Sequence, residues 1–565
     1  MAGKPTGPVD ITGAMIEGPV ALADWLVIAP VALCLTVAAL LLMIRKEVSR
    51  QIPIAIAGLV ALVVLDAMLL AHVWREGPVT MVMGRWLPPF GIAFTVDALG
   101  AAFALTSAIA ATAGGLYALH DIEAREMRYG FWSFLFLMVG GVSGAFLTGD
   151  IFNLYVWFEV LLIASFGLIV LGSTVPQIDG ATKYAFLNLV ATTLFLIGTA
   201  YLYGATGTLN MADMALKLPD AAAAGAPVIT VAALYLLAFG MKAAAFPVNF
   251  WLPASYHTPH IVVSALFAGL LTKVGLYALL RTMLTIMPAA RDELGLVITV
   301  IAALTMVTGA LGALAQSDLR RLMGYLVISG IGIMLAGLAL ASLLAISGAV
   351  LYALHSILVM TALYLVAGMA GAMAGGFSLH AMGGIYRRSA LFSALALVLF
   401  FAVAGLPPFT GFWPKAMLVR AAVDIGAWWL AAAILLNGFL VTIAVGRVFA
   451  LAFWRPDPAP VPAGASTASA MPLPIDPDER DMAGHAPPTG PDPSRAPGLV
   501  PLAGLTALIV IFGLYPEPLV ALAERAGQGL LDPAAYLISV ESVGMEGLPG
   551  RGEGGPPAAG GEGGS

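Results

Sequence analysis

The chain has 565 residues, of which 60% are hydrophobic and only 10% are charged, and its formal net charge is −6. A soluble domain carries about 25% charged residues, so this composition excludes a protein whose surface lies mostly in water. It predicts an all-α polytopic membrane protein built from apolar runs of about 20 residues. The charges form no basic block, so we expect no nucleic acid partner.

The apolar runs predict about fourteen transmembrane helices. The N-terminal residues 1–19 have mixed charges and no short apolar segment after a basic start, so we expect no cleaved signal peptide. The run 344–373 is long for one span, which leaves a tilt or a break open. The predicted spans are 22–44, 53–74, 95–119, 131–149, 151–172, 183–204, 228–250, 261–281, 295–316, 321–341, 344–373, 389–419, 427–452 and 501–523.

Lysines and arginines in the short loops predict the orientation, because cytoplasmic loops carry more of them. One set of loops holds Arg45, Lys46, Arg50, Arg125, Arg128, Lys183, Arg320, Arg321, Arg387, Arg388 and Arg455. The opposite set holds Lys4, Arg75, Arg85, Lys217, Arg281, Arg291, Arg420 and Arg525. The first set is larger, and we therefore expect both termini outside the cytoplasm.

The predicted spans and the composition together divide the chain into six parts. Residues 455–499 are rich in Pro, Ala and Asp and read as a disordered cytoplasmic linker. The expected parts are 1–130 with the first three helices, 131–290 and 291–454 as two repeats, 455–499 as the linker, 500–524 as the last helix, and 525–565 as a Gly-rich tail.

The sequence contains none of the short motifs that bind nucleotides, redox groups or metals. There is no Walker loop, no dinucleotide fingerprint after a strand, no CxxC and no His/Cys cluster. We therefore expect no cofactor, no metal site and no enzymatic chemistry on bound nucleotides or redox centres within this chain.

Glu159 is an ionisable residue near the middle of the run 151–172. A charge at the bilayer centre costs roughly 2.5–3.5 kcal/mol on insertion scales, so such a residue is a candidate for function. A structural pair with a lysine is one reading. The other, which the sequence favours, is a carboxylate that modulates the proton affinity of a neighbouring lysine. Asp150, at the start of the same helix, is expected to be a cap or interface residue.

Lys242 precedes a predicted helix break. Pro247 follows it by five residues and removes a backbone donor, so the helix should kink or break just past the lysine. Broken helices occur at membrane depth only where they line a protein cavity or water. Lysine readily loses its proton when desolvated, which makes Lys242 a candidate proton carrier.

Two further ionisable residues lie within apolar runs. Lys273 is central in IVVSALFAGLLTKVGLYALL, where small residues such as Gly269 and Gly275 let helices approach closely. A relay role is favoured there over a structural one. His355 is either a satisfied core histidine or a relay group, and the sequence leaves both open.

The segment GLPPFTGFWPK repeats the pattern around Lys242. Pro407 and Pro408 break the predicted helix 389–419, and Lys415 follows within it. Two proline-interrupted segments in corresponding places are typical of a repeated transporter fold. Counting helices, the spans four to eight and nine to thirteen form two inverted five-helix repeats, each with its fourth helix broken.

Four segments resemble the proton-conducting antiporter-like subunits of Mrp-type multisubunit Na+/H+ antiporters and of respiratory complex I. These segments are TGDIFNLYVWFEVLLIASFGLIVLG, KAAAFPVNFWLPASYHTPHIVVSALFAGLLTKVGLYALLR, QSDLRRLMGYLVISGIG and GLPPFTGFWPK. The resemblance covers roughly residues 90–450 and is greatest to the D subunits of Mrp antiporters. It implies a multi-pass protein of the bacterial inner membrane with other antiporter subunits as partners.

The resemblance also implies a role in proton transfer for each candidate. Glu159 matches the family's glutamate on the fifth helix, Lys242 the lysine of the broken seventh, and Lys273 the lysine on the eighth. His355 matches a histidine of the eleventh helix and Lys415 a lysine of the twelfth. Several relatives have a lysine shortly after that histidine, where this chain has Met360, so water or Lys273 would have to cover that step.

The predicted function is proton translocation within a Na+/H+ antiporter, along a midplane chain of Glu, Lys and His. The alternative is the same role in a redox-driven complex, either complex I or a related hydrogenase, or in a carbon-uptake complex. A structural scaffold is a third reading, against which the three buried lysines argue. The sequence leaves open whether Na+ crosses this subunit or a neighbour.

Overall fold

The computed structural model describes residues 15–16, 22–457 and 498–543 of the chain. Most of these residues are helical, and the described part contains one two-stranded sheet. The predicted linker 455–499 lies outside the described residues except at its two ends, and so do residues 544–565 of the predicted tail.

The elements of the N-terminal half begin and end as follows. They are η2 (Leu22–Asp24), α1 (Trp25–Met43), α2 (Val48–Glu76), β1 (Val79–Val82), η3 (Met83–Arg85), β2 (Ala93–Val96), α3 (Ala98–Asp121), α4 (Ala124–Arg128), α5 (Phe131–Leu147), α6 (Ile151–Ile169), α7 (Val175–Thr206), α8 (Met211–Ala223), α9 (Val228–Ala243), α10 (Trp251–Ser255), α11 (Ile261–Leu266), η4 (Phe267–Leu271), α12 (Thr272–Leu280) and η5 (Arg281–Ile286).

The elements of the C-terminal half follow the same helical pattern. They are α13 (Pro288–Glu293), α14 (Gly295–Ala315), α15 (Leu319–Leu340), α16 (Leu343–Ala374), α17 (Ile385–Arg388), α18 (Ala390–Ala404), α19 (Phe412–Asp424), α20 (Trp428–Val448), η6 (Phe449–Trp454), α22 (Leu499–Leu514), α23 (Glu517–Leu531) and α24 (Ala534–Ser542).

Ten helices in the described part are long and apolar enough to cross a membrane. The continuous run from α11 through η5 counts as one of them, and α22 with α23 would be an eleventh if the pair is one span. Three shorter apolar helices, α5, α9 and α18, accompany them. The chain is therefore a multi-pass helical membrane protein, as its composition predicts.

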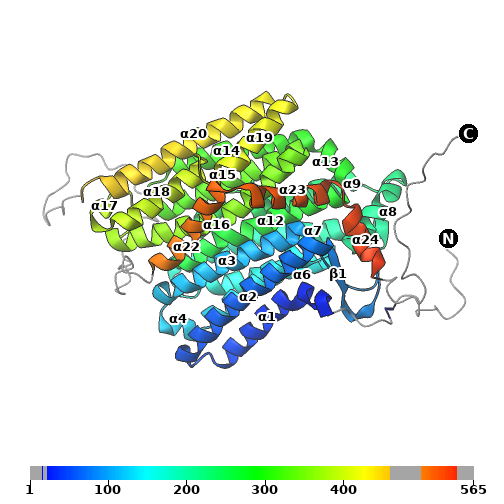
Figure 1. Ribbon diagram of the computed structural model, residues 1–565, viewed down its shortest axis with the longest axis horizontal. Coiled ribbons are helices and arrows are strands. Elements are labelled where there is room, and N and C mark those ends of the chain that lie inside the picture. The colour runs from blue at the N-terminus through cyan, green and yellow to red at the C-terminus, as the bar shows by residue number, and fades with distance from the viewer. Residues whose placement is uncertain (1–14, 17–21, 458–497, 544–565) are drawn as a thin grey trace, which may run out of the picture.

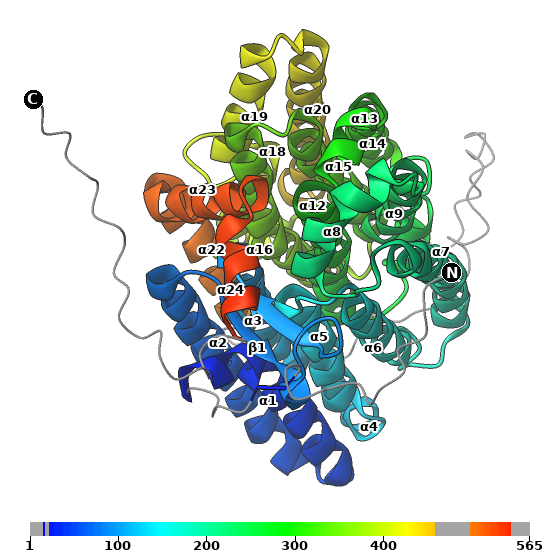
Figure 2. The same cartoon turned by 90° about the vertical axis from the view of Figure 1, so that its right-hand side faces the viewer.

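The helices form one elongated bundle with α16 near its centre (Figures 1 and 2). The blue helices α1 and α2 lie at one edge and the yellow α19 and α20 at the opposite edge (Figure 2). Strand β1, helix α8 and helix α24 lie together at one end (Figure 2). In that end β1 pairs antiparallel with β2, with Val79 opposite Val96 and Val82 opposite Ala93.

Short polar side chains begin several of the long helices. The side chains of Asp97, Asp150, Asp318 and Ser342 each accept a hydrogen bond from a backbone N–H in the first turn of α3, α6, α15 and α16, respectively. These bonds satisfy donors that a helix start leaves without an intrahelical partner. The expectation that Asp150 is a cap is confirmed.

The structure differs from the predicted spans mainly near the C-terminus. The region 344–373 is one uninterrupted helix, α16, without the break that its length allowed. The last predicted span bends by 82° between α22 and α23, where Pro516 cannot donate the hydrogen bond that would continue α22. Helix α24 lies within the segment 525–565 that composition suggested to be a tail.

Candidate functional site

Lys242 lies at the end of a helix that stops within the protein. Helix α9 ends at Ala243, Ala244 has a left-handed backbone with φ of 61°, and Pro247 lies in the non-helical segment before α10. Trp251 Nε1 donates to the carbonyl of Met241, and the backbone N–H of Phe246 donates to Thr305 Oγ1. Protein groups thus satisfy part of the backbone that the break exposes, as a membrane interior requires.

Glu159 and Lys242 lie on neighbouring helices without touching. The Lys242 ammonium lies 4.5 Å from the ring centroid of Phe158, the residue before Glu159 on α6. Glu159 is half-buried, and its Oε1 is buried with no hydrogen-bond partner in the described residues. The charge of the Glu159 carboxylate acts on Lys242. A rotamer change of either side chain would therefore alter the electrostatic interaction between them.

Lys273 lies fully buried at the start of α12. Its Nζ donates to the carbonyl of Ala268 at 2.6 Å, within the π-helical turn η4. A π-helical turn inside a membrane helix frequently marks a functional position. Gly275, two residues further, lies against α9: a Cβ there would be 2.8 Å from Ala243 N and 3.1 Å from the backbone carbon of Lys242. Close packing through this glycine brings α12 beside the broken helix, as the small residues suggested.

His355 on α16 faces the second interrupted helix. Its Nδ1 lies 2.7 Å from Thr410 Oγ1, and its Nε2 is buried without a partner in the described residues. Thr410 belongs to the non-helical segment between α18 and α19, which also contains Pro407 and Pro408. His355 is therefore only half satisfied by the protein around it.

Lys415, in the first turn of α19, reaches back to the end of α18. Its Nζ donates to the carbonyls of Val403 at 3.1 Å and Ala404 at 2.7 Å. These carbonyls are the unpaired acceptors of a helix C-terminus, where the helix dipole favours a positive charge. The carbonyls at the end of α18 thus bind the buried ammonium group of Lys415.

The five predicted residues fall into two groups in the structure. Glu159 acts on Lys242, whereas His355 lies within electrostatic reach of both Lys273 and Lys415. The exposed fractions are 4% for Lys242, 0% for Lys273, 3% for His355 and 8% for Lys415. Ionisable side chains buried within apolar helices are costly in a membrane, so these four residues and Glu159 are candidates for function.

The sequence analysis did not single out three buried charged residues, namely Asp66, Asp97 and Arg281. Asp66 on α2 is fully buried, and neither of its carboxylate oxygens has a hydrogen-bond partner in the described part of the chain. Arg281, which the loop count placed outside the membrane core, is fully buried and paired with Asp97 at 2.8 Å. Each of the three residues lies in or beside a predicted apolar run, so the sequence pattern could have identified all three as candidates.

Arg281 is held by groups from distant parts of the chain. Its Nη2 donates to Asp97 Oδ1 at 2.8 Å and to the Tyr277 hydroxyl at 3.3 Å. The ring of Tyr536 on α24 lies 4.8 Å from its guanidinium carbon. Helix α24 thereby covers this ion pair.

A histidine-containing connection lies between α10 and α11, outside the spanning helices. His260 Nε2 lies 2.7 Å from Glu126 Oε1 on α4. Burial disfavours the charged imidazolium, but the hydrogen bond to Glu126 and the charges of Asp121 and Glu126 outweigh it and raise the pKa of His260. Burial and the charges of Arg321 and Arg320 lower the pKa of His257 to about 4. The two histidines thus have opposite charge preferences.

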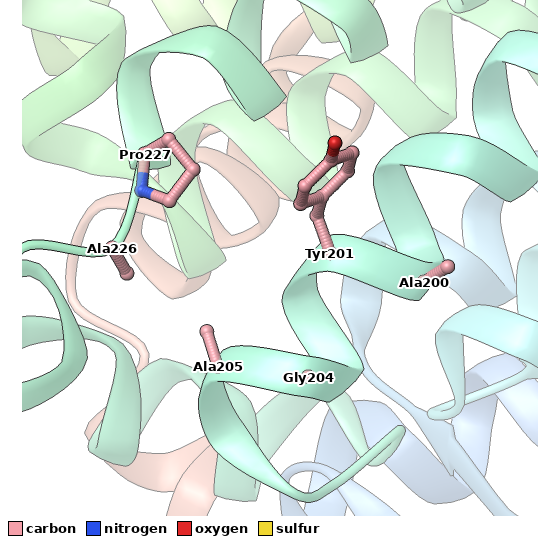
Figure 3. A pocket seen from close by; sticks show the side chains of 6 residues that line it. All are labelled: Ala200, Tyr201, Gly204, Ala205, Ala226 and Pro227. Atoms are coloured by element: carbon pink, nitrogen blue, oxygen red, sulfur yellow. The ribbon is translucent and has the colours of Figure 1, made fainter.

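The described residues were also compared with the requirements of a metal site and of a ligand pocket. They contain no group of three or more His, Cys, Asp and Glu side chains placed to hold a metal ion. A hollow of about 450 Å³ at the end of α7 is lined by Ala200, Tyr201, Gly204, Ala205, Ala226 and Pro227 (Figure 3). It contains none of the predicted proton-transfer residues.

Fold and site together define a class of protein: a polytopic helical membrane protein whose interrupted helices carry buried ionisable residues. Comparison with known proteins narrows this class. Residues 148–441 match the family model described as NADH:quinone oxidoreductase/Mrp antiporter, TM. The chain belongs to this family.

Its relatives include proteins of multisubunit antiporters. It is 35% identical to the D subunit of a Na(+)/H(+) antiporter of Alkalihalophilus pseudofirmus, over 91% of this chain and 99% of that protein. A chain of the Mrp complex from Dietzia sp. superposes with a TM-score of 0.81 at 28% identity, covering 92% of this chain and all of that one. A chain of the archaeal membrane-bound sulfane sulfur reductase superposes with a TM-score of 0.79 at 25% identity, covering 92% of this chain and all of that one.

Proposed function

We propose that the chain is the proton-translocating subunit of a multisubunit Na+/H+ antiporter. The observation that carries this proposal is the burial of Lys242, Lys273 and Lys415 on segments that touch one another or His355. Such charges are expensive in a membrane and are retained where they move ions or protons. The relatives named as D subunits of antiporters support the choice of Na+/H+ exchange.

In this proposal protons pass along Glu159, Lys242, Lys273, His355 and Lys415 through water-filled gaps near the midplane. A closer approach of Glu159 would favour the charged form of Lys242, and its withdrawal would release a proton toward Lys273. Met360, fully buried on α16, contributes no charge, so the step from Lys273 to Lys415 uses His355 with water. The route requires no bound cofactor and no covalent chemistry, which makes the subunit a transporter and not an enzyme.

The proposal includes a topology. It assigns fourteen crossings to the ten long spans, the bent α22–α23 pair and the three shorter apolar helices. Helices broken at Pro247 and at Pro407–Pro408 occupy the fourth place in each of two inverted five-helix repeats, within residues 131–290 and 291–454. Both termini face outward from a bacterial inner membrane, and the segment 455–499 is a cytoplasmic linker.

A redox-driven pump is the second candidate function. It is favoured by the similarity to a chain of the sulfane sulfur reductase, a respiratory membrane complex. The same buried lysines would then move protons under redox drive. Whether Na+ crosses this subunit or a neighbour is part of neither proposal.

Purification of the intact complex separates the two candidates. Native membranes containing the tagged chain are solubilised gently, and the co-purifying proteins are identified by mass spectrometry. The antiporter proposal predicts several small hydrophobic subunits and a larger antiporter-like homologue. Stoichiometric iron–sulfur or flavin proteins in the complex would overturn it in favour of the redox-driven pump.

A further inference from the structure

An apolar cavity separates the N-terminal helices from the last helices of the chain. It has a volume of about 600 Å³, in the range of sites that hold small organic molecules. Its walls come from α2, α3, α16, α22 and α23, together with Thr410 of the interrupted segment between α18 and α19. Six of the lining residues are Ala67, Ala71, Leu105, Leu354, Leu358 and Phe512.

The inner end of this cavity reaches the proposed proton route. His355 and Thr410 both line it, and their side chains are bonded to each other at 2.7 Å. His355 is 3% exposed and keeps one buried ring nitrogen without a partner in the described residues. The wall formed by α22 is fixed to the start of α19, because Trp413 Nε1 donates to the Gly513 carbonyl at 2.9 Å.

The walls favour an apolar occupant over water or an ion. Most of the lining side chains are aliphatic or aromatic, and of the polar ones the Thr106 hydroxyl already donates to the carbonyl of Ala102. The α2 wall is exposed at Ala67 and Ala71, so the cavity is open on one side. Such an apolar surface favours an apolar occupant, whereas a bound water needs two to four polar partners.

The outer end carries positive charge at the end of α2. Arg75 lines the cavity and is exposed; its Nε donates to the carbonyl of Ala71. Beside it, the Arg525 guanidinium of α23 lies 4.6 Å from the Trp74 ring centroid and donates to the Trp74 carbonyl. Neither arginine forms an ion pair with a carboxylate among the described residues. A tryptophan with two arginines at a helix end is typical of the lipid headgroup level.

We propose that this cavity binds an acyl chain of an anionic phospholipid, with the phosphate at Arg75 and Arg525 and the chain end beside His355. The apolar length and the cationic mouth match the two parts of such a lipid. A bound chain end covers the side of His355 that faces this space, so that water in the proposed proton route does not leave on that side. This last consequence rests on the proposed proton route, whereas lipid binding does not.

Photolabelling of the intact complex tests the binding directly. The purified complex is reconstituted with phosphatidylglycerol that carries a diazirine near the end of one acyl chain, and labelled peptides are mapped by mass spectrometry. We expect labels on α3 and α16 at buried or half-buried lining residues such as Leu105, Leu354 and Leu358. Labels confined to the outward-facing Val64 and Met68 of α2 would overturn the proposal.

Matched variants separate the chain from the headgroup. Ala71→Trp fills the cavity and should remove the internal labels, while Val64→Trp, on the same helix but outside the cavity, should keep them. Arg75→Gln should weaken labelling by about five-fold, the effect of one arginine at an anionic lipid surface, and Arg50→Gln at the other end of α2 should not. Equal internal labelling in Ala71→Trp and the unchanged protein, or equal labelling by phosphatidylcholine, would overturn the proposal.

The labelling result is independent of transport. A Glu159→Ala complex that is inactive but labelled normally would leave the lipid site in place. Cross-links from these positions to another protein subunit, in place of the lipid, would show that a partner fills the cavity and would overturn the proposal.

Discussion

The buried pair of Arg281 and Asp97 permits the most quantitative prediction. Replacing Asp97 with Asn keeps the shape of the side chain and its bond to the backbone N–H of Gly100, but removes the negative charge. Arg281, which is fully buried, then keeps hydrogen bonds to the amide oxygen at position 97 and to the Tyr277 hydroxyl, but no longer has a carboxylate as counterion among the groups described above. A buried charge left without its counterion costs about 3–5 kcal/mol.

The double variant distinguishes this cause from simple loss of packing. In Asp97→Asn with Arg281→Gln, no charge remains buried, so the expected loss is smaller than in Asp97→Asn alone. The coupling between the two positions should be in the range of about 0.5–3 kcal/mol found for contacting residues. An exposed pair, Asp213 with Lys217 at 2.7 Å, provides the control: Asp213→Asn should cost at most about 1 kcal/mol.

Thermal unfolding of the purified complex, followed by tryptophan fluorescence, measures these differences. We expect the unfolding temperatures to fall in the order unchanged protein, Asp213→Asn, double variant, Asp97→Asn. If Asp97→Asn unfolds at the temperature of the unchanged protein, or if the double variant is as unstable as the single one, the pair does not have the role assigned here.

Two further predictions concern pH and packing. Glu126 raises the pKa of His260, so the protonated imidazole stabilises the folded protein. His260→Gln should lower the free energy of unfolding by about 1.5–3 kcal/mol, the value for a charge-assisted hydrogen bond, at pH values below the ordinary histidine pKa of about 6.5. This loss should decrease as the pH rises through the raised pKa of His260. A thermal-unfolding difference between the two proteins that grows with rising pH would contradict this. In Gly275→Ala the new Cβ would lie 2.8 Å from the backbone nitrogen of Ala243, the residue after Lys242. The free energy of unfolding should therefore fall by about 1–3 kcal/mol, and antiport in everted vesicles should decrease. Gly295→Ala, which meets open space, is the control, and equal antiport in both variants would refute the packing argument.

Much of the fold could be predicted from local sequence. Apolar runs of helical length located the long helices, and Asp150 before such a run was recognisable as a cap. The interruptions near Lys242 and Lys415 were also visible, because proline restricts the backbone wherever it occurs. These features depend on residues within a few positions of one another.

Features that depend on distant contacts were not visible. Arg281 was counted with the loops because its partner, Asp97, lies 184 positions away and Tyr536 lies on the last helix. The sharp bend after Leu514, by contrast, has a local signal in Pro516 and Pro518; it was missed because apolar residues continue on both sides of these prolines. The cavity beside His355 is formed by helices from both ends of the chain, so no local sequence pattern predicts it.

The arrangement within the candidate site was predicted only in part. The sequence identified buried lysines, but not that Lys415 would be held by the carbonyls of Val403 and Ala404. It also suggested a Glu159–Lys242 pair, whereas the two side chains are neighbours without direct contact. Rotamers decide such distances, and a sequence pattern carries no information about them.

Antiport by Glu159→Ala and Lys242→Ala in everted vesicles tests the central claim most directly. Acidified vesicles receive Na+, the collapse of the pH gradient is followed with a fluorescent dye, and complex assembly is checked by co-purification. Lys217→Ala, an exposed lysine outside the route, is the control and should exchange normally. The account predicts assembled but inactive complexes for both variants; full exchange in both would contradict a proton route through these residues.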